Sequence, residues 1–517
     1  MREFLKKNKR ILLIIGIAIA GVLLLGGIVY GSFRIYYSVN GCSSHIDRND
    51  DGKCDKCRKS VVYEVDFFAI NDIHGKFSDS STQPGVDELT NYLKEQKMVC
   101  DNIVLLSSGD MWQGSSESNL THGQIMIDWM NQMDFVSMTL GNHEFDWGEA
   151  GIAENAEFAE FPFLAINVYD RETKQPVEYC TPSVLVNRGE ITIGIIGAVG
   201  DCYSSIATDQ SKGFYLITGN ELSELVKKES EFLKAQGADF IVLSIHDGYD
   251  ESVGRETVII DRRLAEYYDI ALSAEYIDLV FEAHTHQTYV LKDSKGIYHL
   301  QGGGENKGIS HVTATVNIAN GENKVICAEV VSSSEYARKA KDSLRNELLD
   351  KYSEQISFAI ETLGTNSVVR DGDELREIVS KLYYETGVEK WGNEYKIVLG
   401  GGFLQTRNPW NLSSGDVNYA MLQSLFPFDN ELVLCSVSGA DLNRVFFNTT
   451  NGSYGVYYDE YGESIKGNVN PVETYYVIVD SYTSTYAPNH LTEIERYGSG
   501  VYARDLLSQY VAEGNLE

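Results

Sequence analysis

Short apolar runs alternate with amphipathic segments between residues 62 and 290, and five of the runs end on polar residues. β-branched and aromatic residues, which favour strands, are common in these five runs: VYEVDFFAI, NIVLLSS, FVSMTL, ADFIVLS and IDLVFEA. Two of the segments between them have helical character, DELTNYLKEQKM and GNELSELVKKESEFLKAQG, the second with apolar residues three to four apart. Strands that alternate with helices predict an α/β domain.

The polar residues that follow the five strands can all bind metal ions. Each of them alone has an ordinary explanation, since an Asp can cap a helix, an Asn can form a turn and a single His more often forms a hydrogen bond. Ligands in α/β folds gather beyond the carboxyl ends of the strands, however, and all five clusters have that position. They supply one amide, two carboxylates and five imidazoles: Asp72, His74, Asp110, Asn142, His143, His246, His284 and His286.

This mixture of side chains suits two divalent ions of the zinc, manganese, iron or cobalt type better than calcium or magnesium. Two such ions about 4 Å apart can share a carboxylate and a hydroxide, and they can clamp the attacking and departing oxygens of a phosphoryl transfer. The strand ends therefore indicate a phosphoesterase, in which a metal-bridging hydroxide attacks the phosphorus.

The ordered motifs D-x-H, GD, GNHEFD, an isolated His and H-x-H resemble those of the calcineurin-like metallophosphoesterases. GNHEFDWG resembles specifically the bacterial 5′-nucleotidase and UDP-sugar hydrolase branch. The resemblance covers about residues 62–331 and implies a four-layer sandwich domain over residues 61–334. It also implies two groups of metal ligands with Asp110 between them: Asp72, His74 and His286 for one ion, and Asn142, His246 and His284 for the other.

The same resemblance implies that His143 is a catalytic residue and not a metal ligand. Asp146 would orient the His143 ring, and the imidazolium would stabilise charge that grows on the phosphoryl oxygen or the leaving group. Glu144 and Trp147 are interpreted as packing and turn residues, because an acidic group that faced a phosphate would oppose the reaction.

The pattern changes after Val331, where apolar residues recur at helical spacing and predict a long linker helix over residues 335–364, ended by Gly364. Residues 365–517 resemble the C-terminal 5′-nucleotidase domain, a smaller α/β domain that binds substrate. Its glycine-rich segment and PFDN motif are present, but Leu399 replaces the usual asparagine, and the expected arginine is moved to Arg407 if two residues are inserted. The candidate substrate-binding residues are Arg370, Gly401, Gly402, Arg407, Phe428 and Tyr482, with the two rings at stacking positions.

The charge of the protein limits the kinds of molecule that it can bind. The chain of 517 residues has a formal net charge of -32, which argues against binding a nucleic acid polymer. An anionic phosphate ester would need local positive charge, most simply from metal ions.

The first 31 residues predict a membrane segment. Residues 1–10 form a basic cytoplasmic tail, and residues 11–31 are an uncharged apolar stretch long enough to span a bilayer. This stretch exceeds the core of about 7 to 15 residues in a cleaved signal peptide, so we interpret it as an uncut signal anchor. The positive-inside rule then predicts a single-pass protein of the cell membrane with its catalytic domains outside the cytoplasm. A lipoprotein with Cys42 lipidated is an alternative.

Residues 32–60 form a cysteine-rich stalk with three interpretations. Cys42, His45, Cys54 and Cys57 have the spacing of a structural zinc knuckle. DRNDDGKCD resembles the first part of a calcium loop, although Arg58 stands where the bidentate Glu belongs. A polar stalk with a disulfide is the third interpretation.

The leading functional hypothesis is a membrane-tethered 5′-nucleotidase-like phosphohydrolase. A UDP-sugar hydrolase or a 2′,3′-cyclic-nucleotide phosphodiesterase on the same scaffold is the enzymatic alternative. A surface adhesin or nucleotide receptor with a vestigial catalytic domain is the alternative from a different class.

Overall fold

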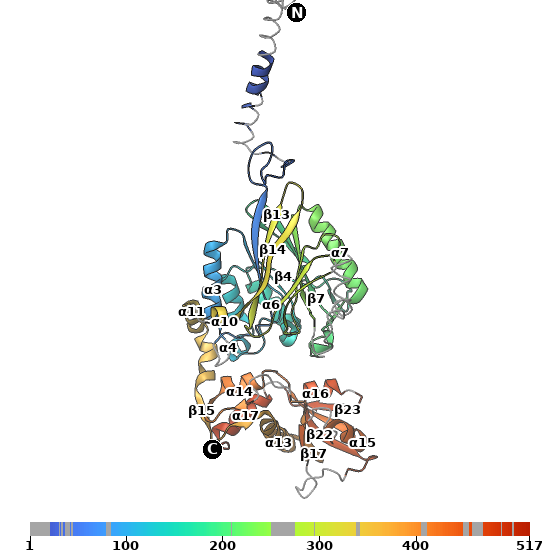
Figure 1. Cartoon of the computed structure of the whole chain (residues 1–517). Helices are drawn as coiled ribbons and strands as arrows, with labels where there is room; N and C mark the ends of the chain where they lie inside the picture. Colours follow the sequence, from blue (N-terminus) through green and yellow to red (C-terminus); the bar gives the residue numbers. More distant parts are fainter. Residues whose placement is uncertain are drawn as a thin grey trace, which may run out of the picture.

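A computed structural model of the chain shows two domains in succession, preceded by an amino-terminal helix (Figure 1). The described residues are 21–29, 31–32, 35–36, 42, 45–78, 84–207, 209–249, 274–293, 295–337, 342–404, 411–447, 454–457, 469–487, 489–498 and 501–517.

The first domain contains two six-stranded sheets. The first sheet has the order β14 (Asn323–Ser332), β13 (Gly308–Asn317), β1 (Val62–Ile70), β2 (Ile103–Ser107), β3 (Ser137–Thr139) and β4 (Phe163–Leu164). The second has the order β11 (Thr288–Lys292), β12 (Tyr298–Gly302), β10 (Leu279–Phe281), β9 (Phe240–His246), β7 (Ile191–Val199) and β6 (Ser183–Arg188). Strands β1 to β4 are parallel, as are β7, β9, β10 and β12, so each group has its carboxyl ends at one edge.

The two sheets pack face to face with helices outside them. Apolar residues from both sheets form the core between them, where the rings of Phe67 and Phe240 stack 5.0 Å apart. Helices α3 (Val86–Val99) and α5 (Gln124–Gln132) cover the outer face of the first sheet, and α7 (Gly219–Ala235) covers that of the second. The result is the four-layer sandwich that the motif resemblance implied.

Shorter elements complete this domain, and several of them adjoin the strand ends. They are α4 (Ser116–Leu120), η1 (His143–Trp147), α6 (Gly148–Phe158), η2 (Tyr203–Ser205) and the antiparallel pair β5 (Val168–Asp170) and β8 (Phe214–Leu216).

The predicted linker helix over residues 335–364 was wrong as a single element. The described part of this segment consists of α10 (Ser333–Tyr336), α11 (Leu344–Lys351), α12 (Ser353–Ile356), η4 (Ser357–Ile360) and β15 (Thr362–Asn366). Leu344, Leu348, Tyr352 and Ile356 pack into the core of the first domain, and one straight helix could not follow that surface. Gly364, expected to end the helix, lies within β15.

The second domain is built on a five-stranded sheet with the order β21 (Tyr454–Tyr457), β17 (Ile397–Gly402), β22 (Thr474–Asp480), β20 (Leu432–Ser438) and β23 (Leu491–Arg496). An apolar core joins it to α13 (Gly372–Trp391), α14 (Tyr419–Leu425) and α17 (Ala503–Ala512). The remaining elements are β16 (Arg370–Asp371), β18 (Asn411–Leu412), β19 (Gly415–Asn418), α15 (Gly439–Leu442), η5 (Asn443–Phe447) and α16 (Ser481–Tyr486). This domain is mixed α/β, as expected.

The amino-terminal helix includes residues 21–29, whose side chains are all exposed. Within the described ranges, no helix has both the length and the hydrophobicity that a membrane crossing requires. Residues 11–20 and residue 30 of the predicted anchor lie outside those ranges.

Candidate metal centre

All five polar clusters meet at one end of the first domain, although their strands belong to two different sheets. Strands β1, β2 and β3 of the first sheet and β9 and β10 of the second contribute one cluster each. Because the parallel strands of each sheet end at one edge, packing the sheets face to face brings the two edges together.

One group of potential ligands consists of Asp72, His74 and His286. The Nε2 atoms of the two imidazoles are 2.9 Å apart, and Oδ1 of Asp72 is 3.2 Å from Nε2 of His286. This Oδ1 atom is buried and has no hydrogen-bond partner. A buried carboxylate oxygen that faces two imidazole nitrogens fits a bound cation, because leaving it unsatisfied costs free energy.

A second group consists of Asp110, His246 and His284. Nε2 of His246 lies 3.2 Å from Oδ2 of Asp110 and 3.2 Å from Oδ1 of Asn142. The same Oδ2 of Asp110 is 3.9 Å from Nε2 of His74, which belongs to the first group. Asp110 therefore lies between the two groups, at the position of a bridging ligand.

Backbone carbonyls orient two of the imidazoles. Nδ1 of His74 lies 3.1 Å from the carbonyl oxygen of Gln113, and Nδ1 of His246 lies 2.8 Å from that of Ser108. Because only a protonated nitrogen can donate to a carbonyl, each Nδ1 carries a proton, so Nε2 is the atom of each ring that a metal ion would bind. Both Nε2 atoms point toward the carboxylates, as metal ligands would.

The pKa shifts follow from burial and from the charges in the site. Burial favours the neutral acid at Asp110, but the charges of His246 and His143 hold the pKa of this carboxyl well below its usual range. Burial together with the neighbouring His246 lowers the pKa of His284 to about 4, so that this imidazole is neutral at pH 7. Burial lowers the pKa of His246, but the charge of Asp110 outweighs burial and raises it to about 10, so a metal ion bound there would displace a proton.

Five of the candidate ligands have left-handed backbone conformations, with φ between 51° and 68°. Such conformations cost about 1 to 3 kcal/mol each in residues other than glycine and are concentrated at functional sites. The five residues are Asp72, His74, Asp110, His284 and His286.

Two glycines allow the strand ends to approach this closely. A Cβ on Gly109 would lie 2.7 Å from Nδ1 of His246, and one on Gly141 would lie 2.3 Å from Oδ1 of Asp110. Both distances are far below van der Waals contact, so a larger residue at either position would displace a candidate ligand.

Glu144 has a role that the sequence did not reveal. Its buried carboxylate accepts hydrogen bonds from the backbone N–H groups of Gly141 (2.6 Å), Asp110 (2.8 Å) and Met111 (2.8 Å). Burial and the neighbouring Asp110 raise the pKa of Glu144 to about 7. Glu144 thus joins the loop after β2, which carries Asp110, to the loop after β3, which carries Asn142. The interpretation of Glu144 as a packing residue missed these hydrogen bonds.

His143 and Asp146 form an ion pair beside the two groups. Nδ1 of His143 is 2.8 Å from Oδ2 of Asp146, and the backbone N–H of His143 donates to Oδ1 of Asp110 at 2.8 Å. The His143 ring lies 5.2 Å from that of His74 and 6.1 Å from that of Phe428 in the second domain. His143 is therefore placed between the candidate ligands and the other domain.

Comparison with known proteins identifies the first domain. Residues 65–288 match the family described as calcineurin-like phosphoesterase. These residues form a calcineurin-like phosphoesterase domain. An apyrase of Aedes albopictus is 28% identical over 258 residues, or 46% of this chain and 42% of that protein. Protein UshA of Yersinia enterocolitica is 22% identical over 440 residues, or 75% of this chain and 76% of that protein.

The fold of both domains is shared with a solved structure. The crystal structure of a 5′-nucleotidase precursor from Thermus thermophilus is similar with a TM-score of 0.64 and 18% identity, over 87% of this chain and 96% of that chain. Calcineurin-like phosphoesterases use a dinuclear metal centre, and the phosphoesterase domain has the matching side-chain clusters.

A cavity of about 420 Å³ lies between the phosphoesterase domain and the second domain. The phosphoesterase domain contributes Asp146, Trp147 and His122 to its wall, and the second domain contributes rings on the opposite side, including Phe428 and Tyr482. Asn119 of α4 donates to the carbonyl oxygen of Pro427 at 3.1 Å, which fixes the loop that carries Phe428 against the phosphoesterase domain. The cavity thus extends from Asp146, the partner of His143, into the second domain.

The other predicted substrate-binding residues have different positions. Arg370, Gly401 and Gly402 are not among the described residues that line this cavity, and Arg407 lies outside the described residues. Nε of Arg370 donates to Oδ1 of Asn366 at 3.1 Å. A Cβ on Gly402 would lie 2.4 Å from Oγ1 of Thr483, so this glycine allows close packing within the second domain.

Arg496 is a cavity residue that the sequence did not indicate. Its guanidinium pairs with Asp209 of the phosphoesterase domain and lies 3.6 Å from Glu431. Hydrogen bonds to Glu493 and Asp209 raise the pKa of Arg496 above its usual range. No local motif surrounds Arg496 at the end of β23, so only the folded chain could place it here.

Proposed function

We propose that this protein is a two-metal phosphohydrolase that releases phosphate from nucleotides or related esters. The observation that carries the proposal is the buried, unpartnered Oδ1 of Asp72, which faces the imidazoles of His74 and His286. A cavity of about 420 Å³ whose wall includes Asp146 supports an organic substrate, since ligand pockets commonly exceed 300 Å³.

Two ions of the zinc, manganese, iron or cobalt type would polarise the phosphoryl group and hold the attacking and departing oxygens in line. Stabilisation of charge and protonation of the leaving oxygen would depend on side chains of the protein. The His143 ring, with Nδ1 held by Asp146, directs its other nitrogen toward the reacting phosphate, where it stabilises negative charge or protonates the leaving oxygen.

Phe428 and Tyr482 line the cavity and would supply ring faces for a nucleobase. The similarity to UshA and to the 5′-nucleotidase fold supports a nucleotide substrate. The departures near Leu399 and Arg407 leave a UDP-sugar or a 2′,3′-cyclic nucleotide as the second candidate substrate. A vestigial receptor would bind such ligands without turnover.

Analysis of the products formed by the metal-loaded full-length chain tests this function: AMP would yield adenosine and phosphate, UDP-glucose would yield UMP and glucose 1-phosphate, and 2′,3′-cyclic AMP would yield ring-opened AMP. AMP, UDP-glucose and 2′,3′-cyclic AMP are offered in parallel, and we expect turnover of at least one, its loss on exhaustive chelation and its recovery with Mn²⁺, Co²⁺ or Zn²⁺. Asp110→Asn should lower turnover more than His286→Ala, because Asp110 adjoins both groups. Full activity of the metal-free chain would refute the two-metal proposal.

We further propose that the protein is a single-pass membrane protein with both domains outside the cytoplasm. The exposed apolar side chains between residues 22 and 29 and the basic first ten residues support an anchor. In intact cells, added protease should release the phosphoesterase domain, while alkaline washing should leave the full chain in the membrane fraction. A chain that alkaline washing removes would contradict the anchor.

A further inference from the structure

Three thiols and one imidazole form a compact cluster immediately before β1. Sγ of Cys42 lies 3.5 Å from Nδ1 of His45 and 3.5 Å from the sulfurs of both Cys54 and Cys57. Sγ of Cys57 lies 3.6 Å from Nδ1 of His45, and all four atoms lie within 4.8 Å of one another. Cys54 and Cys57 are buried.

These distances fit a tetrahedral zinc site. With Zn–S bonds of about 2.3 Å and Zn–N bonds of about 2.0 Å, a tetrahedron places two sulfurs roughly 3.8 Å apart and a sulfur and a nitrogen about 3.5 Å apart. A disulfide would need two of the sulfurs at about 2.05 Å, and the structure leaves all three thiols free. Three soft thiolates with one imidazole select zinc among the common divalent ions.

The backbone around Cys54 and Cys57 holds both sulfurs on one side of a tight turn. The N–H of Arg58 donates to the carbonyl oxygen of Cys54 at 2.8 Å, and the N–H of Cys54 donates to that of Lys59 at 2.9 Å. Arg58 has a left-handed conformation, with φ of 58°, which closes the turn. The two thiols therefore converge without any contribution from a metal.

Among the described residues, the acidic side chains of the same segment form no cluster that could hold a metal ion. Both oxygens of Asp47 accept backbone hydrogen bonds, from Asp51 at 3.2 Å and from Gly52 at 2.8 Å, while Asp51 pairs with Arg58 at 2.9 Å. A calcium loop needs these carboxylates to converge on one point. Their hydrogen bonds instead support the chain that joins Cys42 to Cys54.

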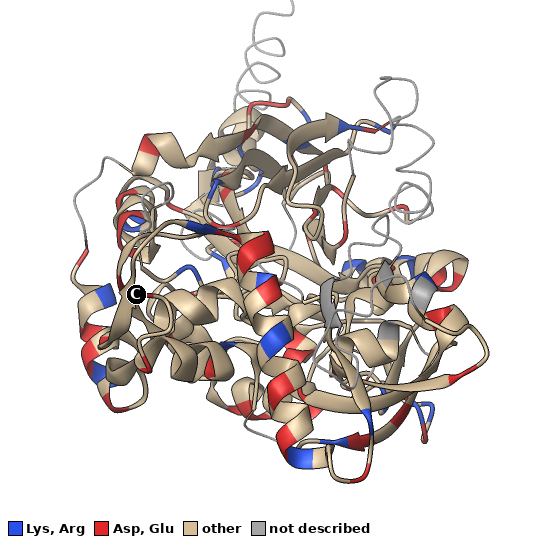
Figure 2. Cartoon of the chain, turned by 90° about the horizontal axis from the view of Figure 1, so that it is seen from below, with Lys and Arg blue, Asp and Glu red and all other residues tan. Residues whose placement is uncertain are grey.

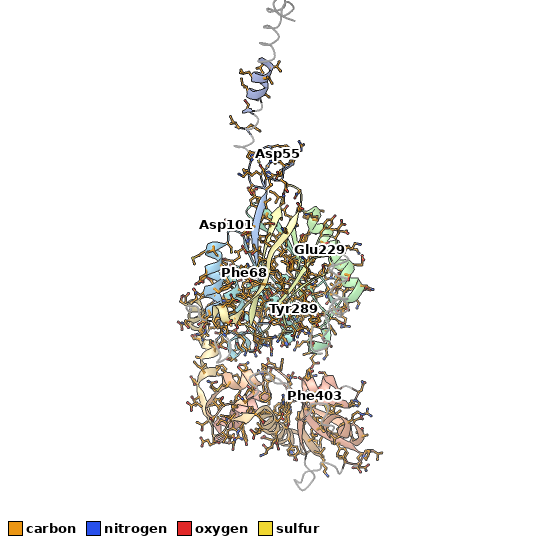
Figure 3. The ribbon with its side chains drawn as sticks, in the orientation of Figure 1. Asp55, Phe68, Asp101, Glu229, Tyr289 and Phe403 are labelled. Carbon is orange, nitrogen blue, oxygen red and sulfur yellow. The ribbon has the colours of Figure 1, made fainter. Side chains whose placement is uncertain are left out.

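The cluster packs against the end of the phosphoesterase domain that is farthest from its metal centre. Ile318, in the turn between β13 and β14, packs against the apolar cluster of Cys54, Cys57 and Val61, and its N–H donates to the carbonyl oxygen of Val61 at 2.9 Å. The nine residues of β1 separate this cluster from Asp72, a distance of roughly 30 Å at the usual rise per residue. In Figure 3, Asp55 of this segment lies on the side of the phosphoesterase domain that is away from the second domain, which carries Phe403.

We propose that Cys42, His45, Cys54 and Cys57 bind a structural zinc ion that fastens the segment before β1 rigidly to the phosphoesterase domain. The ion replaces the hydrophobic core that so short a segment cannot form. The distance from Asp72 excludes a part in catalysis, so the ion would have a structural role at the amino-terminal end of the phosphoesterase domain.

Cobalt substitution in the full-length chain tests this site. Only thiolate ligands give an intense near-ultraviolet sulfur-to-cobalt absorption band, and the candidate ligands of the catalytic centre include no cysteine. We expect the band in the wild-type chain and its loss in Cys54→Ser and Cys57→Ser. Zinc analysis should fall from about three ions per chain to about two, and limited proteolysis between residues 46 and 60 should become at least tenfold faster.

The exposed Cys327 of β14 provides the matched control, since Cys327→Ser should keep the band and all bound metal. Hydrolysis of a small aryl phosphate by Cys54→Ser should stay within twofold of wild type, which shows that the variant is folded. A wild-type chain without the band, a disulfide between two of these cysteines, or protection from proteolysis by calcium and not by zinc would each overturn the proposal.

Discussion

Neighbouring residues after β3 have different roles in the site. His143 lies beside both candidate ligand groups, yet its Nδ1 is committed to Asp146, and its ring faces the second domain. Glu144, the next residue, instead faces inward and fastens the backbone of Asp110 and Gly141. Adjacent positions thus carry a ring that faces the second domain and a carboxylate that holds the backbone of the candidate ligands in place.

His143→Ala should reduce turnover about 10²-fold to 10⁴-fold while both metal ions stay bound, because the change removes a charge-stabilising group and no ligand. Steady-state kinetics together with metal analysis of the same preparation measures both effects. Loss of one ion from the variant would instead show that His143 is a ligand, and the role of Asn142 would need revision.

His299 makes the stability of the phosphoesterase domain depend on pH. Burial lowers the pKa of this imidazole, but Glu282 (2.7 Å) and Asp293 (3.5 Å) outweigh burial and raise it to about 9. Because the folded pKa exceeds the unfolded value of about 6.5, the stabilisation is complete below pH 6.5 and is lost as the pH rises through 9.

For the metal-loaded protein, this loss should be on the order of 3 kcal/mol between pH 6.5 and 9. Thermal unfolding over that range should show a falling midpoint in wild type and a flatter profile in His299→Gln. The variant should also be less stable at pH 6, since Glu282 and Asp293 lose their buried partner. An unchanged pH profile in His299→Gln would contradict the assignment.

At the scale of elements, the segment between the domains is part of the phosphoesterase domain up to about Ile356. Helix α11 packs Leu344 and Leu348 into that domain, and the hydroxyl of Tyr352 donates to Asp128 at 2.8 Å. Any hinge between the domains must therefore follow α12, in the stretch from η4 to β15.

Leu348→Ala should lower the free energy of unfolding of the phosphoesterase domain by about 2 to 5 kcal/mol, the usual cost of a cavity at a buried leucine. Asn346→Ala on the exposed face of the same helix is the control and should change it by less than about 0.5 kcal/mol. Chemical denaturation measures both. Equally small losses would mean that α11 is not fastened to the domain.

At the scale of the whole molecule, the two domains enclose a cavity that neither could form alone. Acidic residues are spread over the face that Figure 2 shows, in keeping with a net charge of -32. An anionic ester therefore approaches an acidic protein, and bound cations would supply the attraction at the centre. The rings on the second domain would add the affinity for the organic part.

Phe428→Ala and Tyr482→Ala should each raise the KM for AMP about tenfold to a hundredfold, because stacking on one ring is worth about 1 to 3 kcal/mol. Hydrolysis of a small aryl phosphate should change little. Kinetics on both substrates with the same preparations separates the two effects. Equal losses on both substrates would show that these rings stabilise the fold instead of binding the nucleobase.

The sequence alone determined which strands end in polar side chains and which residue types follow them, because periodicity and residue chemistry act over a few neighbouring positions. The helices α3 and α7, the strands β1, β2 and β9 and the seven candidate ligands could be predicted in this way. Their assignment to two ions came from motif resemblance, and metal binding itself stays a prediction.

The tertiary structure decided what depends on contacts between distant positions. His74 and His286 lie 212 residues apart in the chain. Their Nε2 atoms are 2.9 Å apart only because packing of the two sheets brings the carboxyl ends of their strands together. Contacts between distant positions also place Arg496 in the cavity wall and end the helix of the linker segment at Tyr352. In each case the packing free energy of residues far apart in sequence outweighs the local preference of the chain.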